Sequence, residues 1–170
     1  MKSHFALALG TATALALALA AGCVKRSEIS AAGQRFVLAE EPSGALGILD
    51  YRESKPEPGD VSLIGRVGLE QLKWSNQSAM FVITDPSEAL EADGQHQCND
   101  ENCPFCKAKA AGHPSRAIVM LIGEDGQVPA IAARKLLPLE DGQTVVVSGR
   151  AEINEQGDLV VHATGLYLRR

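Results

Sequence analysis

From Val61 onward the sequence is dominated by segments that are typical of β-strands. Apolar residues recur at every second position, or stand in short apolar runs rich in β-branched residues, and turn-forming residues end each segment. Between the third and fourth segments, residues 130–137 contain helix formers and stop before Pro138, which predicts one short helix. The pattern predicts an all-β domain with one short helix. The predicted strands are residues 61–67, 79–84, 117–122, 144–153 and 159–168.

The order of these segments, three strands, a helix and then a two-strand hairpin, resembles the OB-fold, a five-stranded Greek-key barrel. A repeated pattern supports this order, because residues 61–67 (V-x-L-x-G-R-V) echo residues 145–151 (V-x-V-x-G-R-A). In an OB-fold the first and fourth strands are neighbours, and a strand glycine permits the bend that closure requires. We therefore predict an OB-fold-like barrel over residues 59–170. An open β-sandwich is the alternative.

The first 22 residues have the layout of a secretory signal peptide. Lys2 precedes an apolar run of mainly Ala and Leu over residues 5–21, and small residues lead directly to Cys23. This order resembles the bacterial lipoprotein signal, although Ala20 stands where that family more often has leucine. The resemblance implies acylation of Cys23, which becomes the new N-terminus, and therefore a lipid-anchored protein of the cell envelope that faces the periplasm. An ordinary cleaved signal and a single transmembrane anchor are the alternatives.

Removal of residues 1–22 leaves 148 of the 170 residues, enough for one domain. Because Lys2 is lost, the formal charge changes from −5 to −6. An acidic chain with few aromatic residues lacks the basic face that nucleic-acid binding requires, so we expect no nucleic-acid partner.

Residues 23–58 are predicted to be an N-terminal tether and extension. The small and polar residues 24–32 predict a flexible tether, and residues 34–38 predict a short strand. Residues 45–52 fit either a short helix or a strand, and Gly47 weakens both.

An insert at residues 87–115 separates the second and third predicted strands and holds three of the four cysteines. Loops of this length are functional, disordered or held by a cross-link. The insert has few large apolar residues, chiefly Leu90 and Phe105, and cannot form a core of its own. We expect Cys98, Cys103 and Cys106 to fix it, through a metal ion or through a disulfide.

The metal interpretation begins with the Cys103-Pro104-Phe105-Cys106 run, whose spacing is that of a knuckle turn that directs two thiolates at one ion. Cys98 supplies a third ligand, and His113, or alternatively His96, supplies the fourth. Three cysteines and one histidine suit a closed tetrahedral Zn²⁺ site, and thiolates also bind Cu⁺. We predict a structural zinc site.

The thiol interpretation remains open, because exported proteins meet an oxidising compartment in which thiols pair. A structural disulfide from Cys98 to Cys103 or Cys106 would leave one thiol over. A redox-active Cys103–Cys106 pair lacks the βαβ context of thiol oxidoreductases. The spacing also matches a plant-type [2Fe–2S] loop, but no cysteine follows Cys106 as the fourth ligand. Lys107 excludes the C-x-x-C-H haem motif.

Residues 59–170 also resemble a family of uncharacterised bacterial exported proteins that join such a barrel to a Cys-rich loop. The resemblance implies this topology and no established activity, so it supplies no catalytic residues. It is carried by Gly65-Arg66-Val67, by the run from Phe81 to Pro86, by Cys98, by Cys103-Pro104-x-Cys106, by Gly149-Arg150-Ala151 and by the run from Leu159 to Gly165.

No nucleophile–base pair, phosphate loop or glycosidase-like carboxylate pair stands out, so we expect no enzymatic activity. Trp74 and Phe81 are expected in the core rather than on a ligand platform, and His162 is expected to be a surface or packed histidine. The predicted function is a membrane-anchored binding or scaffold module of the cell envelope, with an unknown envelope protein as its partner. The alternative is a periplasmic thiol–disulfide or metal-delivery protein that uses Cys103 and Cys106.

Overall fold

The chain folds into a closed β-barrel that is built from the strands with apolar alternation. The computed structural model describes residues 29–54, 57–68, 75–88 and 114–169. In this part of the chain the barrel strands are β2 (Gly59–Val67), β3 (Met80–Thr84), β4 (Arg116–Leu121), β5 (Thr144–Ile153) and β6 (Leu159–Leu168).

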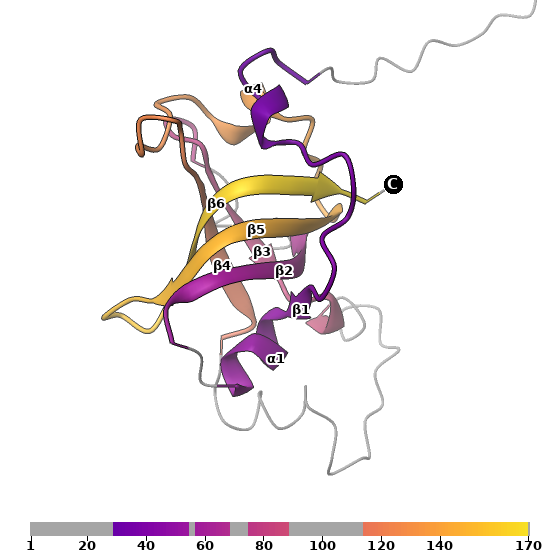
Figure 1. Cartoon of the computed structure of the whole chain (residues 1–170), viewed down its shortest axis with the longest axis vertical. Coiled ribbons are helices and arrows are strands. Elements are labelled where there is room, and N and C mark those ends of the chain that lie inside the picture. The colour runs from indigo at the N-terminus through magenta and orange to yellow at the C-terminus, as the bar shows by residue number, and fades with distance from the viewer. Residues whose placement is uncertain (1–28, 55–56, 69–74, 89–113, 170) are drawn as a thin grey trace, which may run out of the picture.

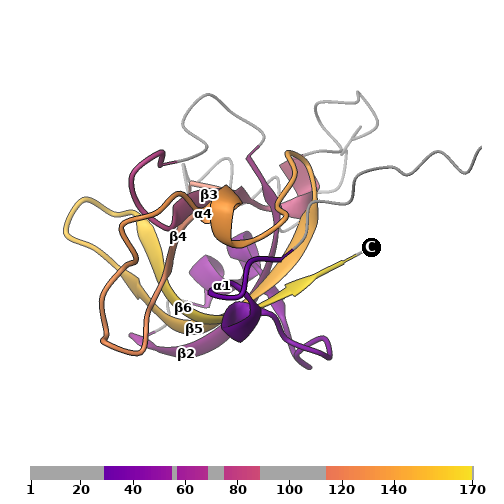
Figure 2. The same ribbon diagram turned by 90° about the horizontal axis from the view of Figure 1, so that it is seen from above.

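The strand order β2-β3-β4-β6-β5 is closed by the pairing of β2 with β5. Within this ring β4 and β6 are parallel, and the other four pairs are antiparallel. Figure 2 shows β2, β5 and β6 on one side of the barrel and β3 and β4 on the other. The predicted five-stranded OB-fold-like barrel is confirmed, and the open sandwich is wrong.

Gly65 and Gly149, the glycines of the repeated pattern, lie where neighbouring strands approach each other closely. A Cβ atom on Gly149 would lie 2.2 Å from the carbonyl oxygen of His162, at a register shift between β5 and β6. A Cβ atom on Gly65 would lie 2.9 Å from the Cβ atom of Ile83 on β3. Glycine therefore lets the wall curve and close at both points, which agrees with the role expected from the repeat.

The inward-facing side chains of the five strands fill the interior of the barrel. Leu63, Val119, Val147 and Val161 are completely buried, and on β2 and β4 the residues on either side of Leu63 and Val119 are partly exposed. Phe81 is 2% exposed, so its predicted place in the core is confirmed.

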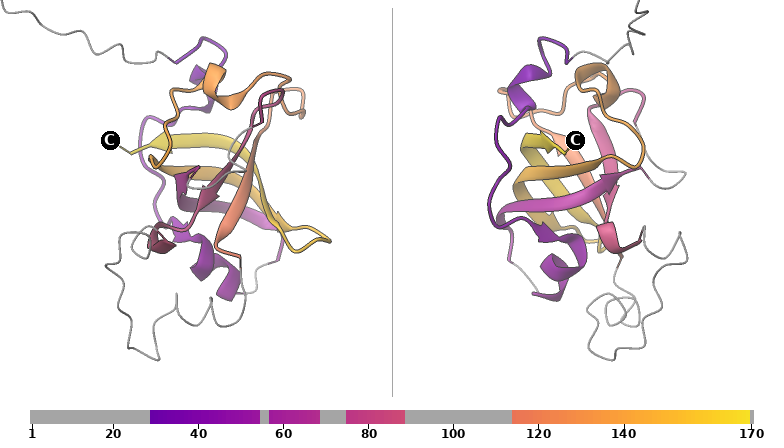
Figure 3. Two further views of the ribbon diagram at one scale, coloured as in Figure 1. Left: turned by 180° about the vertical axis from the view of Figure 1, so that it is seen from behind. Right: turned by 90° about the vertical axis from the view of Figure 1, so that its right-hand side faces the viewer.

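Short helical elements cover the two open ends of the barrel (Figures 1 and 3). One end carries α4 (Ala133–Leu136) and the 3₁₀ helix η1 (Gln34–Phe36). The other end carries α1 (Ile48–Glu53), which follows the two-residue strand β1 (Leu46–Gly47) that pairs with β2. α4 is the helix predicted over residues 130–137, although it is shorter than that range.

The N-terminal segment differs from the expectation in two places. Residues 34–36 form η1 rather than a strand, because Phe36 turns into the core, and only Val37 makes a bridge to Leu166. The described residues 29–32 are not a free tether, since Ser30 donates hydrogen bonds from both N and Oγ to the carbonyl oxygen of Leu136. Residues 45–52 contain both β1 and most of α1, so both alternatives left open there occur.

Candidate functional site

The predicted ligand residues of the insert lie outside the described residues, as does the predicted lipidation site. No group of three His, Cys, Asp or Glu side chains that could hold a metal ion is present in residues 29–54, 57–68, 75–88 and 114–169. The structure therefore describes the attachment of the insert to the barrel. The predicted ligand and lipidation residues that lie outside the described part are Cys23, His96, Cys98, Cys103, Cys106 and His113.

The insert leaves the barrel and returns to it at one point. Thr84 at the end of β3 is paired with Arg116 at the start of β4. One step further out, the backbone N–H of Asp85 donates to the carbonyl oxygen of Ser115 at 2.7 Å, and the Ser115 hydroxyl donates to Glu88 Oε1. These contacts clamp the two ends of the insert together, whatever lies between them.

Asp85 is the central residue of this attachment, because its buried carboxylate joins the insert to α1. Oδ1 accepts hydrogen bonds from the backbone N–H and the hydroxyl of Ser87, in the helical turn at residues 86–88. Oδ2 accepts a hydrogen bond from the backbone N–H of Leu49 at 3.1 Å, in the first turn of α1. One carboxylate thus satisfies unpaired backbone donors at the start of two helical segments, where negative charge is favourable.

The close approach of Asp85 to α1 depends on Gly47. A Cβ atom at this position would lie 3.0 Å from Asp85 Oδ2 and 3.2 Å from Oδ2 of Asp50. Glycine leaves room for both carboxylates at the first turn of α1, although it lowers intrinsic helix and strand propensity.

Arg52 fixes the other side of α1, against the hairpin between β5 and β6. Its side chain is 7% exposed, and both terminal nitrogens donate to the carbonyl oxygen of Gly157 at 3.2 Å. Its Nε has no hydrogen-bond partner among the described residues. Burial lowers the pKa of the Arg52 guanidinium, and the nearby Asp158 carboxylate opposes that shift. Burial likewise raises the pKa of the adjacent Tyr51.

These groups make an anchor rather than a reactive centre. The Asp85 carboxylate is occupied by backbone and hydroxyl donors, and the Arg52 guanidinium is directed at a backbone carbonyl. Their chemical role is to hold α1, the β5–β6 hairpin and the first residues of the insert together at one end of the barrel.

The remaining residues with a position expected from the sequence are His162 and Trp74. His162 lies on β6, and its Nε2 is 3.4 Å from Glu152 Oε1 on β5, with 37% of the histidine side chain exposed. It is therefore a partly exposed surface histidine, one of the two positions expected for it. Trp74 lies outside the described residues.

The sequence interpretation missed the roles of Asp85 and Arg52. The Asp85-Pro86 pair carries a usable signal, since aspartate before proline is typical of a helix start. No comparable local signal marks Arg52, because its partner Gly157 is 105 residues away.

No protein-family model matches this chain, and no curated protein matches it. Its class is therefore defined by structure alone, as an OB-fold-like barrel that carries a clamped insert. No helix within the described part of the chain is both long enough and apolar enough to cross a membrane.

Proposed function

We propose that this chain is a cell-envelope lipoprotein, anchored through acylated Cys23, whose barrel presents a zinc-binding insert to a protein partner. Cys98, Cys103 and Cys106, with His113 or His96, would hold the ion. Zinc in such a closed site is structural, and it orders a loop that has too few apolar residues to form a core. The protein would act as a binding or scaffold module of the exported lipoprotein type that its sequence resembles, without an enzymatic activity.

The observation that supports this proposal is the clamp at the base of the insert. Asp85, Glu88 and Ser115 hold the two ends together, and Asp85 also binds α1. A loop whose ends are fixed loses less conformational entropy when it closes around an ion, because its closure has already occurred. The clamp is equally compatible with a disulfide, so the experiment must separate the two.

The deciding measurement is elemental analysis of the purified full-length chain, combined with thiol counting before and after unfolding in chelator. We expect one zinc per chain and thiols that become reactive only after the metal is removed. Cys103→Ser should abolish zinc binding, whereas Lys107→Gln, a control in the same insert, should retain it. A metal-free chain with a reversible Cys103–Cys106 disulfide would contradict zinc and favour the thiol–disulfide alternative.

Anchoring is tested separately, by incorporation of a labelled fatty acid in bacterial cells. Label should appear in the unchanged chain and in Cys98→Ala, and it should disappear in Cys23→Ala. Equal label in both variants would overturn acylation at Cys23. Two or more acyl chains hold a protein stably at a membrane, so the chain should also fractionate with membranes only when Cys23 is present.

A further inference from the structure

The outer face of the barrel carries a row of three side chains from three adjacent strands. Two of them are thioethers and one is an imidazole. Met80 on β3 is paired with Met120 on β4, and Met120 is paired with His162 on β6. Residues that are directly paired across strands point to the same face of a sheet. Their chain neighbours Phe81, Val119 and Val161 are buried in the barrel, so this face is the outer one.

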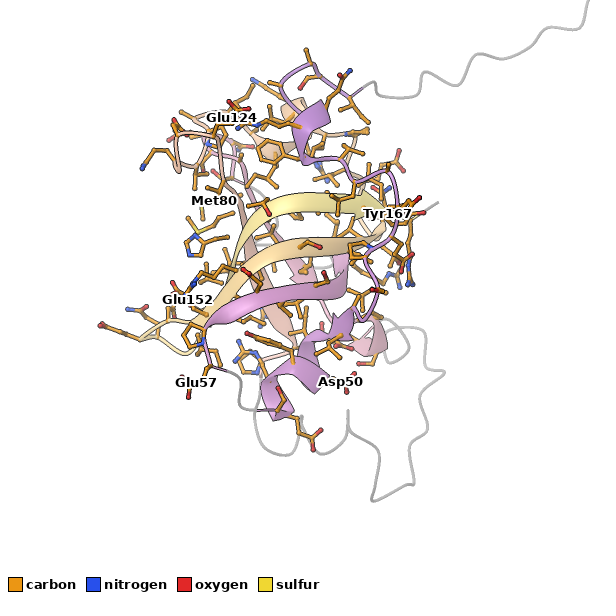
Figure 4. The ribbon with its side chains drawn as sticks, viewed as in Figure 1. Asp50, Glu57, Met80, Glu124, Glu152 and Tyr167 are labelled. Carbon is orange, nitrogen blue, oxygen red and sulfur yellow. The ribbon has the colours of Figure 1, made fainter. Side chains whose placement is uncertain are left out.

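All three side chains of this row are partly accessible to solvent. In Figure 4, Met80 and Glu152 are labelled on the same side of the barrel. Adjacent strands lie about 4.8 Å apart, so Met80 and His162 flank Met120 at a total separation of roughly 10 Å. A methionine side chain has three rotatable bonds and adapts to irregular sites, which lets both thioethers reach toward a common point beside the imidazole.

Glu152 orients the imidazole of His162. Its Oε1 lies 3.4 Å from His162 Nε2, and the tautomer with its proton on Nε2 would donate to this carboxylate and keep Nδ1 for a metal ion. Histidine ligands of metal ions characteristically donate their second ring N–H to a carboxylate in this way. The Glu152 carboxylate would also place a negative charge beside a cation bound in this row.

The neighbouring rows complete the surroundings. The next outward-facing row on the same three strands is apolar. It consists of Val82 on β3, Ile118 on β4 and Val160 on β6, which are paired with one another. In the row itself, Arg150 of β5 follows His162, and Asp60 of β2 is paired with Arg150. Asp60 is therefore the cross-strand neighbour of Arg150 on the side away from His162.

Thioether sulfur selects soft monovalent cations over Zn²⁺, Mg²⁺ or Ca²⁺, and imidazole accepts the same soft ions. We propose that Met80, Met120 and His162 form a surface site for Cu⁺, for which Ag⁺ is a redox-inert probe, with Glu152 as a positioning residue. This site is separate from the cysteine-rich insert and does not depend on the proposed zinc site. No bond is made or broken beyond coordination of the ion.

The experiment is an Ag⁺ titration of the full-length chain labelled at its methionine methyl groups and followed by NMR. Of the chain's three methionines, Met1 belongs to the proposed signal peptide and Met80 and Met120 to the barrel, so the two barrel methyl signals report on the site. Cys23, Cys98, Cys103 and Cys106 are changed to serine, because their thiolates would compete for Ag⁺. The methyl signals of Met80 and Met120 should shift together and saturate at one equivalent, and Zn²⁺ should leave them unchanged. If the serine variant does not fold, the unchanged chain is titrated beyond the capacity of its thiols.

Variants test the assignment of each ligand. Met120→Leu, which keeps the side-chain volume, and His162→Gln should each raise the Kd for Ag⁺ at least about tenfold. Ile118→Leu, a matched change in the next row, should leave it unchanged. Glu152→Gln should weaken binding and also change the ¹⁵N shifts that report which nitrogen of His162 carries the proton. Methyl signals that do not move at one equivalent, or an affinity that His162→Gln leaves unaltered, would overturn the proposal.

Discussion

Both barrel ends carry a short helix that buries apolar side chains, among them Leu136 of α4 and Ile48 of α1, yet within the described residues the end near α1 also buries polar side chains. Near α4, Phe36 and Leu136 are buried apolar side chains, and the hydrogen bonds of Ser30 go to a backbone carbonyl. Near α1, the chain buries Arg52, Thr84 and Asp85, which are the buried polar residues of the described part of the chain.

The difference shows what each end is built to do. Apolar packing is insensitive to direction, and it closes the end at which α4 and η1 lie. Buried polar groups demand specific partners, so they fix the angle and position of the segments they join. Asp85 and Arg52 therefore fix the position of α1 relative to the base of the insert and to the β5–β6 hairpin.

The largest effect should come from the apolar end. Phe36→Ala removes a side chain that is 2% exposed and leaves a cavity, so we expect a loss of about 3–5 kcal/mol in the free energy of unfolding. Urea denaturation followed by circular dichroism measures this loss. Phe36→Leu should cost less than half as much, and equal costs would show that η1 does not pack as the structure indicates.

At the polar end, Asp85→Ala should remove about 2–4 kcal/mol, because it leaves the N–H groups of Leu49 and Ser87 without their acceptor. Hydrogen exchange should accelerate at these two amides and remain slow at Val147 in the barrel wall. The control is Asp125→Ala, an exposed aspartate that accepts one backbone hydrogen bond and should cost well under about 1 kcal/mol.

Equal effects of Asp85→Ala and Asp125→Ala would remove the distinction between the two barrel ends. Asp85→Asn separates the effect of charge from that of hydrogen bonding. The amide keeps one acceptor oxygen, whereas the negative charge at the start of two helical segments is lost. We expect its cost to lie between those of the two alanine variants.

Arg52→Met should change stability by less than about 1 kcal/mol, although Arg52 is nearly as buried as Asp85. Methionine keeps the apolar stem, and the desolvated guanidinium with its unpartnered Nε is removed. The carbonyl of Gly157 is in an exposed turn, where water replaces the lost donor. A loss above about 2 kcal/mol in urea denaturation would show that the Gly157 contact is stronger than its geometry implies.

The smallest effect concerns the surface pair Glu41–Arg169, which ties the N-terminal segment to the end of β6. Arg169 Nε donates to both carboxylate oxygens of Glu41 at 3.1 Å, and this hydrogen bond holds the pKa of Glu41 below its usual value. A depressed carboxyl pKa stabilises the fold above the unfolded value, and this contribution disappears as the pH falls through the folded value.

Glu41→Gln should therefore lower the urea midpoint slightly at pH 7 and leave it unchanged well below the folded pKa. A ¹³C titration of the Glu41 carboxyl group gives the folded value directly. A difference between the two chains that persists at low pH would mean that the pair acts through packing and not through charge.

The strands of the barrel could be predicted because their patterns are local. Residues 144–153 and 159–168 match β5 and β6 to the residue, since period-two alternation and a turn at each end specify a strand without outside help. The glycine echo also predicted the β2–β5 neighbours. The strand predicted at residues 34–38 does not form. Phe36 is buried in the core by contacts with residues distant in sequence, and this burial overrides the local strand propensity.

The candidate sites were less predictable, for the same reason. The cysteine spacing of the insert is a local signal, and it remains a prediction. The capping of α1 by Asp85 joins residues 36 positions apart, and the row from Met80 through Met120 to His162 exists only once the strands are in register. No window of sequence contains that information.

The sequence by itself determined the five strands of the barrel, where the chain must turn between them and which loop holds the cysteines, because these depend on periodicity and side-chain chemistry within a few residues. The tertiary structure alone decided which strands are neighbours in register, which end of the barrel buries charge and which surface side chains share a row. Those depend on closure of the barrel, which brings distant residues together and leaves each buried polar group only the partners that the closed fold provides.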